Sequence, residues 1–95
     1  MSAPVSKCQQ ALALADELEE LTALIPPRYQ DAGSYERGLA AVIRHVQAAG
    51  GRLDDVGTGS AIRLCGYRAT SEMGPLAACS NWIRQVRAKC APAAQ

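Results

Sequence analysis

The segment from Ala61 to Cys90 constrains the fold of this chain most strongly. Ala61–Ala69 reads AIRLCGYRA, which favours a β-strand, and the polar residues TSEMGP interrupt the chain after it. A helix then follows, because apolar side chains recur at alternating steps of three and four residues and form one continuous face. The members of this stripe are Leu76, Cys79, Ile83, Val86 and Cys90. Either Ser71 or Gly74 can cap this helix, because both choices leave Pro75 in its first turn.

Two further helices are expected before this segment. The first runs from about Pro4 or Ser6 to Ile25, with Ser6 and Gln9 spaced as a capping box and Ser2 as a rival start. Its apolar stripe contains Ala11, Leu14, Leu18, Leu21 and Ile25. Pro26 and Pro27 end it, because proline donates no backbone hydrogen bond.

The second helix is expected to start with Ser34 as its N-cap and to end at Gly50 and Gly51. Gly38 inside it is a position where the first helix can approach closely. The stripe of this helix contains Tyr35, Leu39, Val42, Val46 and Ala49.

Residues 52–56 make a poor strand on propensity, because Asp54 and Asp55 interrupt the apolar residues. Gly57–Ser60 is a turn signal, so a β-hairpin is expected with Ala61–Ala69 as its better strand. The sequence therefore predicts one small α+β domain over residues 1–95, in the order ααββα, with its N-terminal helices antiparallel. The ordered core is expected over about residues 4–90, followed by a frayed tail over residues 91–95.

Composition narrows the class of protein further. Phenylalanine is absent and aromatic residues are few, so the core must be aliphatic and rich in alanine. No apolar run reaches the roughly 18 residues that span a bilayer, and the N-terminus lacks the apolar run of a secretion signal. These features predict a soluble protein in the bacterial cytoplasm with no membrane partner. The excess of arginine over lysine and the abundant alanine are common in GC-rich bacteria and their phages.

The four cysteines lack the paired spacing of a metal site, and His45 is the only imidazole. Cys79 and Cys90 lie about 16 Å apart on one helix and cannot form a disulfide there. Cys8 can reach Cys90 only if the two ends of the chain meet. The favoured interpretation is four reduced, buried thiols with no metal and no other cofactor.

No pattern of catalytic residues is present. His45 has no carboxylate or cysteine near it in sequence, and the glycines do not form a phosphate-binding loop. A protein that is not an enzyme is therefore expected.

Charge is distributed unevenly along the chain. Residues 1–27 carry Lys7 against four carboxylates, a net charge of −3, whereas residues 61–95 carry five cations against Glu72, a net charge of +4. The acidic residues of the first helix are Asp16, Glu17, Glu19 and Glu20. They either bind a basic partner or form a solvated face that arginines of the last helix partly neutralise.

The last helix offers a second candidate interface at Trp82, Arg84 and Arg87. Trp82 is expected to be half buried against the hairpin, either as an interaction hot spot or as a lid over the sheet. An alternative interface, for nucleic acid, consists of the basic residues Arg63, Arg68, Arg84, Arg87 and Lys89. If these residues do not bind nucleic acid, they are expected to keep the protein soluble and to pair with its acidic groups.

These features predict a non-enzymatic protein-interaction module, an accessory protein of a phage or mobile element that inhibits or recruits a host complex. Anti-CRISPR inhibitors belong to this class, although they share no motif. Homodimerisation through one of the apolar stripes is a further option. A nucleic-acid-binding regulator that uses the basic C-terminal helix is the first alternative.

The second alternative comes from a resemblance. From Leu39 onward, the order helix, hairpin, helix with Ala69-Thr70-Ser71 entering the last helix resembles phage head-to-tail joining proteins. This resemblance covers about half of the chain and implies a role in virion assembly.

Overall fold

The computed structural model describes residues 6–90, which form an α+β fold. Its elements are α1 (Lys7–Ala23), α2 (Ala32–Ala48), β1 (Arg52–Val56), β2 (Gly59–Leu64), β3 (Tyr67–Ser71) and α3 (Pro75–Lys89). The fold class is confirmed, but the predicted two-stranded hairpin is wrong, because the chain forms three strands. The possible start at Ser2 or Pro4 and the predicted tail over residues 91–95 lie outside the described residues.

The extra strand arises at Cys65 and Gly66, where the run predicted as one strand reverses direction. Both residues have positive φ, 54° and 81°, which the favoured two-residue hairpin turns require. Leu64 and Tyr67 close the turn as Cα partners. Glycine adopts this conformation without steric cost, and cysteine rarely adopts it. The result is an antiparallel sheet in the order β1-β2-β3.

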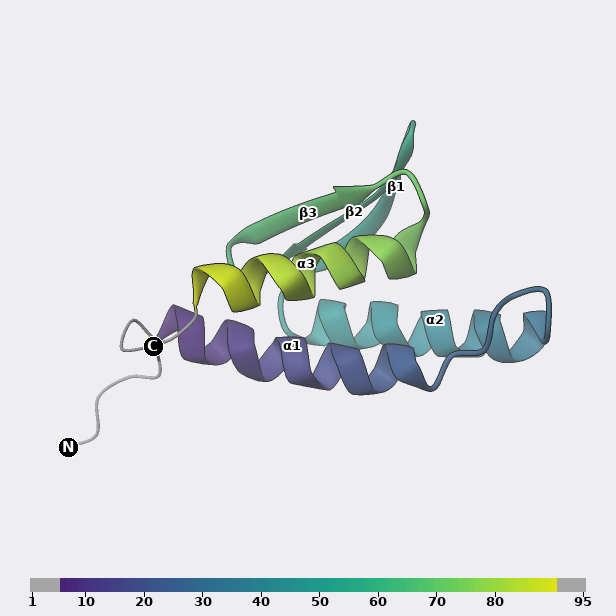
Figure 1. Ribbon diagram of the computed structural model, residues 1–95, viewed down its shortest axis with the longest axis horizontal. Helices are drawn as coiled ribbons and strands as arrows, with labels where there is room; N and C mark the ends of the chain where they lie inside the picture. The colour runs from purple at the N-terminus through teal and green to yellow at the C-terminus, as the bar shows by residue number, and fades with distance from the viewer. Residues whose placement is uncertain (1–5, 91–95) are drawn as a thin grey trace.

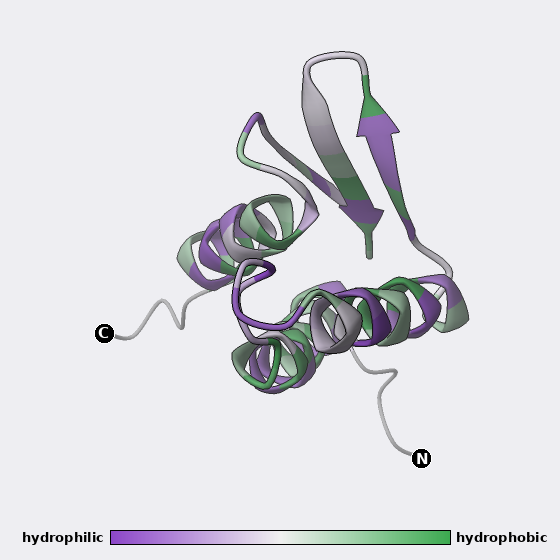
Figure 2. Cartoon of the chain, turned by 90° about the vertical axis from the view of Figure 1, so that its right-hand side faces the viewer, coloured by the Kyte–Doolittle hydropathy of each residue, from purple (hydrophilic) through white to green (hydrophobic). Residues whose placement is uncertain are grey.

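The helices all lie on one side of this sheet (Figure 1). α3 packs along β2 and β3, α1 packs against α3, and α2 contacts α1 and β1. Seen from the end where α2 starts, the opposite side of the sheet carries no helix (Figure 2). Strand residues alternate between the two faces, so Leu53, Ile62 and Leu64 point into the core, whereas Arg52, Asp54 and Arg63 point to the uncovered face.

The core contains most of the stripes that the sequence predicts for the helices, but Ala49 is exposed, and Tyr35 and Leu76 are only half buried. Ala11, Ala15 and Leu18 of α1 are fully buried, as are Val42 and Val46 of α2. The buried residues of α3 are Ala78, Cys79, Trp82, Ile83 and Val86. A close approach occurs at Gly38, where an added Cβ would lie 2.5 Å from Cγ1 of Ile25, but Ile25 lies just beyond the end of α1 rather than within it.

Helix ends follow local capping rules, with one correction. Ser6 and Gln9 form the predicted capping box, with both hydrogen bonds at 3.0 Å. Ser34 is not the N-cap of α2. Asp31 takes that position and accepts a hydrogen bond from the Ser34 backbone N–H at 3.0 Å, because its carboxylate is the stronger acceptor. Of the two predicted starts of α3, Gly74 is the N-cap.

No helix within residues 6–90 has the length and apolarity that crossing a bilayer requires.

Candidate functional site

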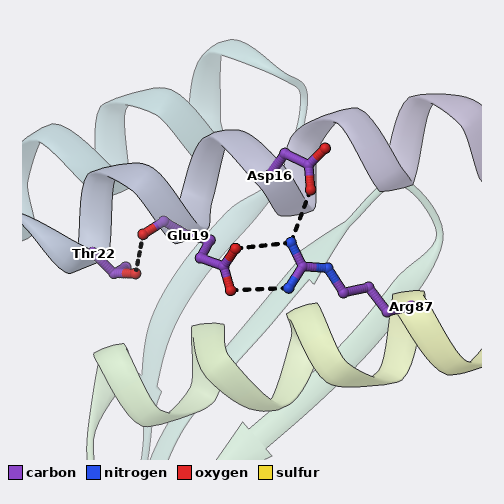
Figure 3. Close-up of polar contacts among 4 residues, drawn as sticks. All are labelled: Asp16, Glu19, Thr22 and Arg87. Atoms are coloured by element: carbon purple, nitrogen blue, oxygen red, sulfur yellow. Dashed lines mark hydrogen bonds and ion pairs between the residues drawn. The ribbon is translucent and has the colours of Figure 1, made fainter.

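The acidic residues of α1 are largely engaged by cations of the same chain. The guanidinium of Arg87 binds the Glu19 carboxylate at 2.9 and 3.0 Å and Asp16 at 2.8 Å (Figure 3). These hydrogen bonds lower the pKa of Glu19 and raise that of Arg87. The attraction expected between the acidic first helix and the basic last helix therefore occurs within the chain.

Glu17 is also engaged, because its Oε1 lies 2.7 Å from Nε2 of His45 on α2. This contact orients an imidazole that has no partner near it in sequence. Glu17, Glu20 and His45 line a surface hollow of about 300 Å³ together with Leu21 and Leu24. Leu24 is 81% exposed. This hollow combines the exposed Leu24 with Glu20, a carboxylate that forms no ion pair within residues 6–90.

Trp82 does not form a surface with Arg84 and Arg87. It is 0% exposed rather than half buried, and its indole N–H donates to the backbone oxygens of Leu64 and Tyr67 at 3.2 and 3.3 Å. These two oxygens flank the Cys65–Gly66 turn. Trp82 therefore holds this end of the sheet on α3, while Arg84 is exposed and donates to Asn81 on its own helix.

The uncovered face of the sheet carries a row of arginines. Arg63 on β2 is the direct partner of Arg52 on β1 and of Arg68 on β3. All three side chains are exposed. Arg52 pairs with Asp54 at 3.1 Å, but within residues 6–90 Arg63 and Arg68 form no ion pair. Two cations therefore stand side by side on the open face without an anionic partner among the described residues.

A hollow of about 320 Å³ adjoins this row. Its lining runs around the β2–β3 turn and consists of Gly50, Arg63, Leu64, Cys65, Gly66, Tyr67 and Arg68. The concavity therefore lies at the end of the sheet where the two arginines and the exposed backbone of the turn meet.

Two lysines reach the same turn from the helix side of the sheet. Nζ of Lys7 lies 4.8 Å from the centre of the Tyr67 ring, and Nζ of Lys89 lies 5.8 Å from it. Lys7 also covers the turn, because a Cβ at Gly66 would lie 2.5 Å from its Cε. We call this set the basic end, defined as Lys7, Arg52, Arg63, Arg68 and Lys89.

The basic end includes three of the five residues predicted for nucleic-acid binding: Arg63, Arg68 and Lys89. The other two lie elsewhere, since Arg87 is bound to α1 and Arg84 lies further back along α3. Lys7 and Arg52 were missed. The sequence signal that points to Arg52 is its place at the start of the weak strand over residues 52–56. Only the register of β1 on β2 places it opposite Arg63.

The cysteines differ from the predicted set of four reduced thiols. Cys8 and Cys90 form a disulfide with Cα atoms 5.3 Å apart, because the start of α1 and the end of α3 lie together. Cys65 is a half-buried free thiol, and Cys79 is a fully buried one. Burial raises the pKa of Cys79 to about 11. The prediction is therefore wrong for Cys8 and Cys90 and correct for Cys79.

Within the described part of the chain, no group of three or more His, Cys, Asp or Glu side chains is placed to hold a metal ion. No protein-family model, curated protein or solved structure matches this chain.

Proposed function

We propose that this chain is a non-enzymatic binding module that contacts the phosphate backbone of a nucleic acid through its basic end. One observation carries the proposal: Arg63 and Arg68 are direct cross-strand partners on an uncovered face and have no ion pair within residues 6–90. Like charges placed directly opposite each other destabilise a sheet, and an anionic ligand would offset this repulsion. Arginine suits phosphate because its guanidinium donates two parallel hydrogen bonds.

The same face indicates how the ligand is contacted. The residues that alternate outward on the three strands include no aromatic side chain on which a base could stack. Contacts to phosphates position a protein but do not read sequence. The expected ligand is therefore a duplex bound through its backbone without sequence preference, rather than a single strand bound by stacking.

The test is fluorescence anisotropy with a labelled 20-base-pair duplex in about 20 mM salt. Neutralising both arginines in Arg63→Ala/Arg68→Ala is expected to weaken binding about tenfold or more, because hydrogen bonds to charged groups are lost. Arg44→Ala/Arg84→Ala removes the same charge from exposed positions elsewhere and is expected to change affinity less than twofold.

The salt dependence of binding provides a further check. A plot of the logarithm of the wild-type binding constant against the logarithm of the salt concentration should have a slope of about −0.9 for each phosphate contact. No binding by wild type at low salt would refute the proposal. Equal loss in both double variants would refute the assignment to the basic end. A loss confined to Arg44→Ala/Arg84→Ala would instead place the contact at Arg44 on α2 or Arg84 on α3.

A second candidate is the protein-interaction module predicted from the sequence, a cytoplasmic accessory protein that inhibits or recruits a host complex. The hollow beside Leu24 favours it, because an exposed apolar side chain lies next to Glu17 and Glu20. Leu24→Ser/Glu20→Lys should abolish capture of a host protein from lysate, while Arg63→Ala/Arg68→Ala should retain it. The opposite pattern would exclude this surface.

A role in virion assembly predicts that the purified protein forms rings, which electron microscopy can test.

A further inference from the structure

We propose that the Cys8–Cys90 disulfide switches the basic end between two states, with nucleic acid bound more tightly in the oxidised protein. This inference rests on the proposed function. The bond joins the first turn of α1 to the C-cap of α3, which are separated by 82 residues in sequence. Helix ends open at lower free energy than core segments, so a covalent link at this point restrains the two parts that fray most easily.

The link acts on the basic end because each cysteine directly follows one of its lysines. Lys7 precedes Cys8, and Lys89 precedes Cys90. Both ammonium groups lie over the ring of Tyr67, whose hydroxyl oxygen is 3.7 Å from Sγ of Cys8 and 3.4 Å from Sγ of Cys90. The disulfide, the ring and the two lysines therefore form one unit beside the β2–β3 turn.

The arginine row does not depend on this bond. Arg63 and Arg68 are fixed by the strand register, and Trp82 anchors the turn to α3 through its indole hydrogen bonds. Most core residues of α1 and α3, such as Leu18, Cys79 and Ile83, lie further from the two ends than Cys90, which also belongs to the core. Reduction is therefore expected to release the two lysines while the fold and the arginine row persist.

The chemistry requires a dithiol reductant. One thiolate of the dithiol attacks a sulfur of the Cys8–Cys90 bond and forms a mixed disulfide, and the other cysteine leaves as a thiolate that takes up a proton. The second thiol of the reductant then displaces the remaining cysteine, which is likewise protonated. Two electrons pass to the protein disulfide, and the reductant becomes a disulfide. Disulfides are rare in cytosolic proteins and are usually transient, catalytic or redox-sensing where they occur, so a switch is the role expected of this bond in the cytoplasm, the location that the sequence predicts.

The test compares oxidised protein with protein reduced by dithiothreitol, using the labelled duplex described above. Reduction should weaken binding several-fold and reduce the salt slope by about 1.8, the value for two lost phosphate contacts. Lys7→Ala/Lys89→Ala should bind as weakly when oxidised as reduced wild type, and reduction should not weaken it further. Cys79→Ala is the matched control, because it removes a free thiol that lies outside the basic end and should retain the full redox response.

A second measurement follows the lysines without any ligand. Acetylation of Lys7 and Lys89 by an activated ester, mapped by mass spectrometry, should become faster on reduction, while circular dichroism remains unchanged. Absence of binding by oxidised wild type would refute the proposed function. Equal binding by the oxidised and reduced protein, or equal acetylation rates, would refute only the switch.

Discussion

Arg87 on α3 donates hydrogen bonds to both carboxylate oxygens of Glu19 on α1, at 2.9 and 3.0 Å. The same guanidinium reaches Asp16 at 2.8 Å, so one cation bridges two carboxylates of the neighbouring helix. The opposite charges of the first and last helices therefore stabilise the packing of α1 on α3. A face that neutralises itself in this way is less available to a basic partner.

We expect Arg87→Glu to lower the free energy of unfolding, because it places a third carboxylate beside Asp16 and Glu19. Glu19→Arg in the same chain should recover part of the loss. The pKa of Glu19 is lowered in the folded protein, so the stability that this pair contributes is present above the unfolded pKa of Glu19 and is lost as pH falls through the folded value.

Urea denaturation at pH 7 and pH 3 measures this effect. The difference between wild type and Arg87→Ala should be larger at pH 7. A difference of equal size at both pH values would show that Arg87 acts through packing of its aliphatic stem instead.

Trp82 is expected to behave as a core residue. Trp82→Ala should lower the free energy of unfolding by about 3–5 kcal/mol, because it leaves a large cavity between α3 and the sheet. Trp82→Phe retains most of the packing but removes the donor to Leu64 and Tyr67, which should cost about 1–3 kcal/mol. Under conditions where Trp82→Phe is folded, duplex binding should match wild type. A folded Trp82→Phe protein with lost binding would place the indole in the interface.

The misplacement of Trp82 and the missed arginine row have the same physical origin. The stripes of the helices are local patterns with a fixed period, so the sequence predicts α1, α2 and α3 within a few residues. The Cys65–Gly66 turn lacks the usual Asn-Gly or Asp-Gly signal, and Gly66 alone was too weak a sign of it. Without that turn, the backbone oxygens of Leu64 and Tyr67 do not come together to accept from the Trp82 indole. Arg63 and Arg68 would then lie along one strand rather than side by side.

Contacts between distant segments account for the remaining errors. Lys7 lies 59 residues before Gly66 in the sequence, yet its side chain covers that glycine. The Cys8–Cys90 bond requires the start of α1 and the end of α3 to meet, which follows only from the antiparallel packing of these two helices (Figure 1). No local pattern encodes either meeting, so the sequence allowed the disulfide without predicting it.

Thiol labelling should distinguish the four cysteines. In the folded, oxidised protein, iodoacetamide should modify Cys65 alone, because Cys8 and Cys90 are bonded and Cys79 is buried. With a pKa of about 11, only about one in a thousand Cys79 thiols is ionised at pH 8. Reduction should add Cys8 and Cys90, and only unfolding should add Cys79. Mass spectrometry gives the number of labels at each step, and labelling of Cys8 without reductant would disprove the disulfide.

The β2–β3 turn provides a last test, because the position of the arginine row depends on it. Gly66→Ala should lower the free energy of unfolding by about 1–2 kcal/mol, since an L-residue is disfavoured at a φ of 81°. The added methyl group would also displace Lys7. Gly57→Ala in the β1–β2 turn is the matched control, because its φ is not positive and no atom lies within 4 Å of the added Cβ. If the two variants unfold at the same urea concentration, Gly66 does not adopt the positive φ that this turn requires.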